Sequence, residues 1–179
     1  MKGREKIYIA PVNFQDNELL QCLSAELGQK FSLPCALLPL KKDLSFAFNP
    51  RRNQYHSTII LKGLKFEIPG DCLRILLVVN QDLFVPDLNF VFGEAEIGGP
   101  AAIISLTRLR PEFYRLKPDR NVFRERTAKE AVHELGHTFG LVHCRNSSCV
   151  MFFSNSLLDT DRKKSDFCSS CRRKLFTIR

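Results

Sequence analysis

The sequence predicts a mixed α/β fold in which a twisted sheet is backed by helices. Segments with strand-like and helix-like hydrophobic patterns alternate over the first 140 residues, as expected for a sheet covered by helices. Residues 73–79 (LRILLVV) are almost continuously apolar, which is typical of a strand buried on both faces. Residues 89–97 and 101–106 are extended segments separated by Gly-Gly-Pro at 98–100, a strong turn signal. We therefore expect two further strands at that place.

The remaining elements follow from periodicity and from helix boundaries. An amphipathic helix should open at Asp16, because apolar residues recur at helical spacing from Leu19 to Leu27. The last long helix should begin after Pro118, since proline disfavours helix before it and tolerates helix after it. From Gly140 onwards the pattern dissolves, which predicts a loop-rich tail. In chain order, the other expected elements are a strand at 6–13, the helix at 16–30, a strand at 35–40 and a second helix within the ambiguous segment 54–66.

The length of the chain bounds the number of domains. A chain of 179 residues is long enough for one domain with a real core and too short for two independent ones. We expect a single domain over 1–179, with a sheet-and-helix part at 1–140 and a C-terminal subdomain at 141–179. The charged start and the short apolar run at 7–12 do not resemble a signal peptide, and no run approaches the roughly 20 apolar residues needed to cross a bilayer. We therefore expect a cytoplasmic protein.

One short stretch of the last predicted helix, HELGH at 133–137, combines two histidines with a glutamate. Positions i and i+4 of a helix differ by about 40° in azimuth and lie about 6 Å apart along the axis. His133 and His137 therefore project from one face, where a single cation can contact both. Glu134 lies beside the first ligand, close enough to reach a water on the metal. Alone, a motif this short is weak evidence, because it also arises by chance on solvated helices.

The motif continues with a glycine and a third histidine. Gly140 follows His137 by three residues, and His143 follows Gly140 by three. A glycine suits a helix end with a left-handed residue, and the turn brings His143 back as a third ligand. Three neutral imidazoles leave the fourth position of a tetrahedral zinc open, as in a catalytic site. Zinc would lower the pKa of a bound water there, with Glu134 as general base. The fourth histidine of the chain, His56, stands apart from the motif.

The seven cysteines form two groups, and four of them fall between positions 144 and 171. In a reducing cytoplasm, clustered cysteines are more often metal ligands than disulfides. A Cys-x4-Cys pair together with a Cys-x2-Cys pair is a four-thiolate set typical of structural zinc. The alternative is a redox pair at 168–171, but these residues do not open a helix after a strand as thioredoxin-like motifs do. The four candidate ligands are Cys144, Cys149, Cys168 and Cys171, and the scattered Cys22, Cys35 and Cys72 are expected to be buried thiols.

The string HELGHTFGLVHCRNSSCVM at 133–151, followed by CSSC at 168–171, resembles the archaemetzincins, a branch of the metzincin zinc peptidases. The extended histidine signature with a downstream methionine is shared by metzincins. Met151 is the only methionine besides the initiator, and the resemblance places it beneath the catalytic zinc. It also implies two zinc ions per chain, a catalytic one on the three histidines and a structural one on the four cysteines. The segment from Met151 to Cys168 is one residue shorter than the family pattern, which concerns the loop and not the ligands.

The resemblance also implies a metzincin-like fold with a substrate-binding edge strand above the cleft. Metzincins bind the substrate backbone along an antiparallel edge strand. Independent support for such a strand is limited to the strand, glycine turn and strand pattern. Some metzincins stabilise the oxyanion with a tyrosine near the methionine, but all three tyrosines of this chain precede the histidine motif. The residues expected in the edge strand are Phe90, Val91, Phe92, Gly93, Glu94 and Ala95.

Two functions are compatible with these features. The leading hypothesis is a zinc metallopeptidase, either an endopeptidase or an aminopeptidase, with Glu134 as general base. The alternative is a zinc-ribbon-like binding protein with a vestigial catalytic site. The intact Glu134 favours the enzyme, because a purely structural site has no use for a base. The net charge of +8 comes from dispersed residues with compact groups only at 162–164 and 172–174, so we expect no nucleic-acid partner. The expected partner is a peptide or protein substrate, without a membrane, for a monomeric protein.

Overall fold

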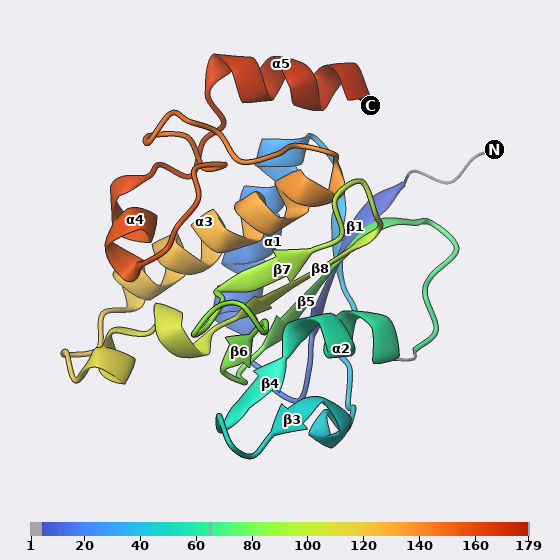
Figure 1. Cartoon of the computed structure of the whole chain (residues 1–179). Coiled ribbons are helices and arrows are strands. Elements are labelled where there is room, and N and C mark those ends of the chain that lie inside the picture. The colour runs from blue at the N-terminus through green and yellow to red at the C-terminus, as the bar shows by residue number, and fades with distance from the viewer. Residues whose placement is uncertain (1–4, 65, 179) are drawn as a thin grey trace.

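A five-stranded sheet in the order β2-β1-β5-β8-β7 forms the centre of the fold. The computed structural model describes residues 5–64 and 66–178 (Figure 1). Four strands are parallel, and β7 runs antiparallel beside β8 at one edge of the sheet. The predicted mixed sheet with an antiparallel edge strand is therefore confirmed. The strands are β1 (Lys6–Pro11), β2 (Cys35–Leu37), β5 (Cys72–Val79), β7 (Gly93–Ala95) and β8 (Ala101–Ser105).

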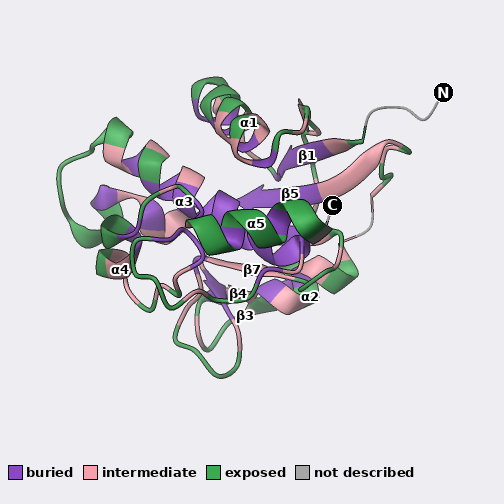
Figure 2. Ribbon diagram, turned by 90° about the horizontal axis from the view of Figure 1, so that it is seen from above, coloured by how far each residue is buried: buried purple, intermediate pink, exposed green. Residues whose placement is uncertain are grey.

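Alternate residues of the central strands supply two separate cores, one on each face of the sheet. Ile7 and Ile9 of β1 pack in the cluster that also contains the buried side chains of α1 (Asn17–Phe31) and α3 (Arg120–Thr138). Tyr8 and Ala10 pack in the other cluster, together with Ile60 of α2 (Ser57–Gly63). Because side chains alternate across a strand, β1 and β5 must be apolar on both faces. β1 is buried after its first residue and β5 over its last five residues, and Figure 2 shows these parts of the two strands in purple.

Side-chain caps set the boundaries of the two long helices. The Asp16 carboxylate accepts a hydrogen bond from the backbone N–H of Leu19 at 3.1 Å, which opens α1. The Asp119 carboxylate accepts hydrogen bonds from the N–H groups of Asn121 and Val122, each at 3.0 Å, which opens α3. Such caps satisfy N–H groups that have no partner within the helix. The helix predicted after Pro118 therefore begins two residues later.

The second helix predicted within the ambiguous segment 54–66 is present but shorter than that segment, and Lys65 lies outside the described residues. Residues Gln54–His56 form β4, and only Ser57–Gly63 form the helix α2. β4 joins a second, three-stranded sheet that the sequence did not reveal, because strands of two or three residues are too short to show alternation. That sheet has the order β3-β4-β6, with β3 at Phe48–Asn49 and β6 at Leu83–Phe84. The described residues also form three 3-10 helices, which are η1 (Ser45–Ala47), η2 (Thr107–Leu109) and η3 (Pro111–Tyr114).

The C-terminal tail is irregular at 141–156 and again at 163–168, as expected for a loop-rich segment. Between and after these stretches it forms two short helices that the sequence did not predict, α4 (Leu157–Arg162) and α5 (Ser169–Ile178). A capping box opens α4, in which Ser156 and Asp159 satisfy each other's backbone N–H groups. The outer surface of α5 is exposed (Figure 2). The division at residue 140 stays a prediction.

No helix among the described residues is long and apolar enough to span a membrane. The first four residues of the charged N-terminal segment lie outside the described residues.

Candidate metal centre and substrate cleft

Two histidines one turn apart on α3 direct their Nε2 atoms towards each other. The Nε2 atoms of His133 and His137 lie 3.1 Å apart. Their Nδ1 atoms lie 2.8 Å from the carbonyl oxygen of Val150 and 2.7 Å from that of Leu141. A carbonyl can only accept, so each Nδ1 carries the proton and each Nε2 presents a lone pair. Two facing lone pairs repel unless a cation lies between them, and this donor set therefore fits a metal ion.

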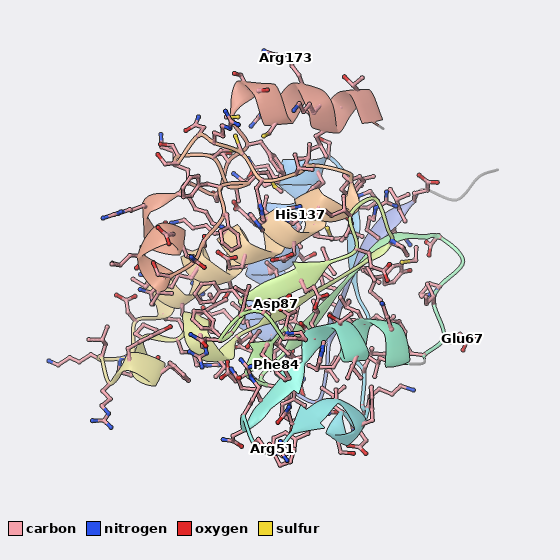
Figure 3. The ribbon with its side chains drawn as sticks, in the orientation of Figure 1. Arg51, Glu67, Phe84, Asp87, His137 and Arg173 are labelled. Atoms are coloured by element: carbon pink, nitrogen blue, oxygen red, sulfur yellow. The ribbon has the colours of Figure 1, made fainter. Side chains whose placement is uncertain are left out.

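His143 completes the set from the turn after α3. Gly140 has φ +83°, a left-handed conformation that reverses the chain. The ligand atoms of His133, His137 and His143 all lie within 4.8 Å of one another. Zn–N bonds of about 2.0–2.1 Å place tetrahedral ligand atoms about 3.4 Å apart, so the three rings need little movement to hold zinc. His137 is labelled in Figure 3. His56 is not part of the group, and its ring packs against Phe84.

All three imidazoles have pKa values below their ordinary value, although His143 is exposed. Burial lowers the pKa of His133 well below its ordinary value, and the positive charge of Lys163 lowers it further. Burial also lowers the pKa values of His137 and His143. Neutral imidazole is the form that binds metal. The site is therefore ready for a metal ion at neutral pH.

Glu134 lies in the same cleft as the histidines, in contact with the edge strand. Its side chain is buried, and burial, followed by the negative charge of Glu130, raises its pKa well above the ordinary value. A Cβ atom built on Gly93 of β7 would lie 2.6 Å from the Cγ atom of Glu134. The strand can therefore pass this close to Glu134 only because residue 93 has no side chain.

The cleft is a cavity of about 280 Å³ between β7, α3 and the turn at 153–155. Its floor carries Glu134 and the three histidines, and its far wall includes Phe153, whose ring centroid lies 4.8 Å from that of His143. A concave site with convergent polar groups is the usual form of an active site. The structure thus brings the predicted base, the predicted ligands and the predicted strand into one cavity.

The predicted edge strand at 90–95 is shorter than expected. Only Gly93–Ala95 forms β7, and the N–H of Val91 donates instead to the carbonyl of Leu83 in β6. The carbonyl of Phe92 and the N–H of Glu96 bond to β8. Because backbone groups alternate in direction along a strand, Glu94 also points to β8. Gly93 and Ala95 therefore direct their N–H and C=O groups to the free edge.

Met151 lies directly beneath the α3 helix. It is fully buried, and a Cβ atom on Gly136 would lie 2.5 Å from its sulfur. Gly136, the glycine within HELGH, is thus the point where α3 meets the turn at 149–152, which we call the methionine turn. The carbonyl of Met151 also accepts a hydrogen bond from the N–H of Cys144 at 2.9 Å. Together these contacts attach the turn to both the histidine helix and the cysteine segment.

The four clustered cysteines converge at the start of α5. Their sulfur atoms all lie within 4.8 Å of one another, and the sulfurs of Cys144 and Cys168 are 3.8 Å apart. Zn–S bonds of about 2.3 Å imply tetrahedral sulfurs about 3.8 Å apart, whereas a disulfide requires about 2.0 Å. The N–H of Cys168 donates to the sulfur of Cys149 at 3.2 Å. A hydrogen bond from the backbone N–H of Cys171 is the largest of the causes that lower the pKa of Cys168 to about 7. The group fits a structural zinc ion.

The other three cysteines are less buried than expected. Cys22 is exposed, and Cys35 and Cys72 are half-buried. Cys22 lies on α1, where the apolar stripe continues through Leu19 and Leu23 and leaves position 22 on the outer side. The prediction of three buried thiols is therefore wrong for Cys22.

A buried ion pair behind the cleft was not evident from the sequence. Lys163 is inaccessible to solvent, and its Nζ lies 3.0 Å from Glu130 Oε1. The same oxygen accepts a hydrogen bond from the hydroxyl of Thr160 at 2.9 Å. Glu130 lies one turn before Glu134 on α3, so Lys163, directly after α4, neutralises the second carboxylate of this helix face. A lysine within a basic run looks solvated, and nothing in its sequence context predicts burial.

Comparison with known proteins then decides the family. Residues 17–177 match the model of peptidase family M54. The chain belongs to peptidase family M54. It is 45% identical to an archaemetzincin of Methanocaldococcus jannaschii over 170 residues, covering 95% of this chain and 92% of that protein. This confirms the resemblance inferred from the histidine and cysteine motifs and makes the chain a zinc metallopeptidase.

Solved structures of archaemetzincins and of a zinc-dependent peptidase share the fold. The crystal structure of archaemetzincin from Archaeoglobus fulgidus, complexed with malonate, aligns with a TM-score of 0.80 at 40% identity, covering 94% of this chain and 99% of that one. A zinc-dependent peptidase from Methanocorpusculum labreanum aligns with a TM-score of 0.84 at 31% identity, with the same coverage. The metzincin-like fold expected from the sequence is thus confirmed for this M54 peptidase.

Proposed function

We propose that this M54 peptidase hydrolyses peptide bonds at the histidine cleft, with His133, His137 and His143 as ligands of a catalytic zinc ion and Glu134 as general base. The observation that carries the proposal is the pair of Nε2 atoms 3.1 Å apart, each with its Nδ1 proton fixed by a carbonyl. A bound zinc ion would polarise the substrate carbonyl and lower the pKa of a coordinated water towards 7.

The protein's own groups would position the substrate and move the proton. Glu134 would take a proton from the attacking water and later deliver it to the departing amine. Burial raises the pKa of Glu134 above its ordinary value, which makes its carboxylate a stronger base than a solvated one. The free edge at Gly93 and Ala95 would pair with the substrate backbone, as in strand addition.

We further propose a second, structural zinc ion on Cys144, Cys149, Cys168 and Cys171, which gives two zinc ions per chain. This site would anchor the segment that presents the third histidine, because His143 and Cys144 are adjacent. The hydrogen bond from Cys144 to Met151 ties the same segment to the methionine turn. The zinc-ribbon-like alternative leaves Glu134 and the substrate cleft without a role.

The test is a zinc count on three proteins. Wild type should bind two zinc ions, and both His143→Ala and Cys168→Ser should lose one. When a chelator is added to the wild type, it should remove zinc from the open histidine site first, because a four-thiolate site is closed. Cys168→Ser should also weaken zinc binding at the histidines, since metal at the cysteines contributes folding free energy to that segment. One zinc ion in fully supplied wild type would contradict the two-site proposal.

A further inference from the structure

Glu94 occupies the middle of the edge strand and lines the cleft from the side opposite α3. Its side chain is half-buried. Its carboxylate accepts hydrogen bonds from the hydroxyl of Thr58 at 2.7 Å and from the hydroxyl of Ser57, both in the first turn of α2. These hydroxyls hold the carboxylate in one place without neutralising its charge.

The negative charge of Glu94 has no cationic partner in the part of the chain that the structure describes. Three glutamates line the cleft, Glu94, Glu130 and Glu134, and no described lysine or arginine does. Glu130 is neutralised from behind by Lys163 at 3.0 Å. Glu134 has a chemical role in the proposed reaction. Glu94 therefore contributes an unbalanced negative charge at the substrate side, in a chain whose net charge is +8.

The strand register determines what lies opposite Glu94. Its backbone groups point to β8, so a substrate strand at the free edge would bond to Gly93 and Ala95 and place one residue in a non-hydrogen-bonded pair with Glu94. Residues paired in this way have Cβ atoms about 4.5–5.5 Å apart and project to the same face. One substrate residue would thus extend its side chain alongside the Glu94 carboxylate.

We propose that Glu94 is a specificity residue that selects substrates with a cationic group at the position paired with it. The cation is either a lysine or arginine side chain or the free α-ammonium group of a short peptide. The proposal rests on the proposed function, because it assumes that peptides bind along β7. Opposite charges in directly paired positions favour binding, and a half-buried cleft screens them less than open solvent does.

A purely structural role for Glu94 predicts something different. If Glu94 only connects β7 to α2 through its hydrogen bonds, its substitution would weaken the binding of all substrates equally. As a selector, it affects cationic substrates alone. Thr58→Val serves as the matched control, because it removes one hydrogen bond to the carboxylate and keeps the charge. Glu94→Lys reverses the charge and should transfer the preference to acidic peptides.

Binding is measured by fluorescence anisotropy on zinc-loaded Glu134→Gln protein, so that no turnover is needed. The probes are labelled peptides of one length, each with lysine or norleucine at a single scanned position and with a free or acetylated N-terminus. Lysine should bind about fivefold more tightly than norleucine at one position, which is the upper end of what a cross-strand charge pair contributes. The acetylated series separates the side chain from the α-ammonium group.

Three outcomes decide the matter. In the Glu134→Gln background, Glu94→Gln should abolish the preference for lysine and leave the affinity for norleucine peptides unchanged. Thr58→Val in the same background should retain the preference. Equal binding of lysine and norleucine peptides at every position, with and without acetylation, would overturn the proposal. If Glu94→Gln weakens the affinity for charged and neutral peptides equally, the proposal is also overturned, and the role of Glu94 is to connect β7 to α2. Cleavage by wild type is assayed separately, so a failure of the peptidase reaction is distinguishable from a failure of selection.

Discussion

At the residue scale, the site depends on atoms whose roles are set by their neighbours. The Nδ1 atoms of His133 and His137 face carbonyl oxygens, which fixes the tautomer and directs both Nε2 lone pairs to one point. The carbonyls belong to Val150 and Leu141, on the two segments that follow the helix. The ligand orientation therefore depends on the turn after α3 and on the methionine turn as much as on α3 itself.

Gly93 is expected to control the position of Glu134. In Gly93→Ala, the new methyl group would meet the Cγ of Glu134 at 2.6 Å and the carbonyl of Ile103 at 2.7 Å. Displacement of a reacting group by about 1 Å can cost about 10²-fold in rate, so kcat/KM should fall by up to that factor while zinc content stays unchanged. Gly28→Ala is the control, since its Cβ meets nothing closer than 3.4 Å. Wild-type kinetics in Gly93→Ala would contradict this account.

The spacing of residues along the chain was enough to predict the two groups of candidate metal ligands. The three histidines and four cysteines converge as their intervals indicated. The Lys163–Glu130 pair was missed because it joins residues 33 positions apart through a buried contact. The close approach of Gly93 to Glu134 was missed for the same reason, since only the packed strand and helix reveal it.

At the element scale, β7 combines two roles in three residues. It closes the sheet against β8 with the backbone of Glu94, and no strand among the described residues pairs with the outer edge of Gly93 and Ala95. Exposed edge groups are a template for another strand. A substrate is the partner that we propose for this edge.

Ala95→Pro is expected to raise KM and leave kcat nearly unchanged. Proline removes one N–H group, and a single hydrogen bond contributes about 0.5–1.5 kcal/mol, so KM should rise about two- to tenfold. The comparison is with Ala95→Ser, which keeps the N–H group. Steady-state kinetics on one peptide substrate decide it. Equal KM values for both variants would place the substrate backbone elsewhere.

The sequence predicted long elements well and short ones poorly. α1, α3 and β5 have enough residues for their periodicity and caps to be recognised. The three-stranded sheet β3-β4-β6 has strands of two or three residues, and its pairing depends on contacts distant in sequence. The helix α5 was missed because its start is defined by the cysteine cluster and not by a hydrophobic stripe.

At the scale of the whole molecule, the metal centre makes folding sensitive to pH. His133 and His137 have pKa values below the ordinary 6.5 in the fold, so the unfolded chain binds more protons as the pH falls through that value. Each histidine can then lower the free energy of unfolding by up to about 1.4 kcal/mol per pH unit. Glu134 acts in the opposite direction, because its raised pKa lets the folded state take up a proton first.

Glu134→Gln should therefore make the protein more sensitive to acid when the histidine site has been emptied by chelator. The variant loses a group whose proton uptake on folding opposes the effect of the histidines. Its free energy of unfolding should fall more steeply than that of wild type between about pH 7 and pH 5. Urea unfolding at several pH values measures the two slopes. Parallel curves would show that Glu134 takes up no extra proton in the fold.

The central claim is that Glu134 is a base and not a ligand, and one comparison tests it most directly. Zinc content and peptide hydrolysis are measured together on wild type, Glu134→Gln and the control Glu125→Gln, whose exposed carboxylate on α3 pairs only with Lys129 among the described residues. Glu134→Gln should keep its zinc and lose about 10²- to 10⁴-fold in kcat, the usual contribution of general-base catalysis, while Glu125→Gln stays at the wild-type rate. A Glu134→Gln protein that cleaves at the wild-type rate, or that loses zinc from the histidine site, would contradict the account.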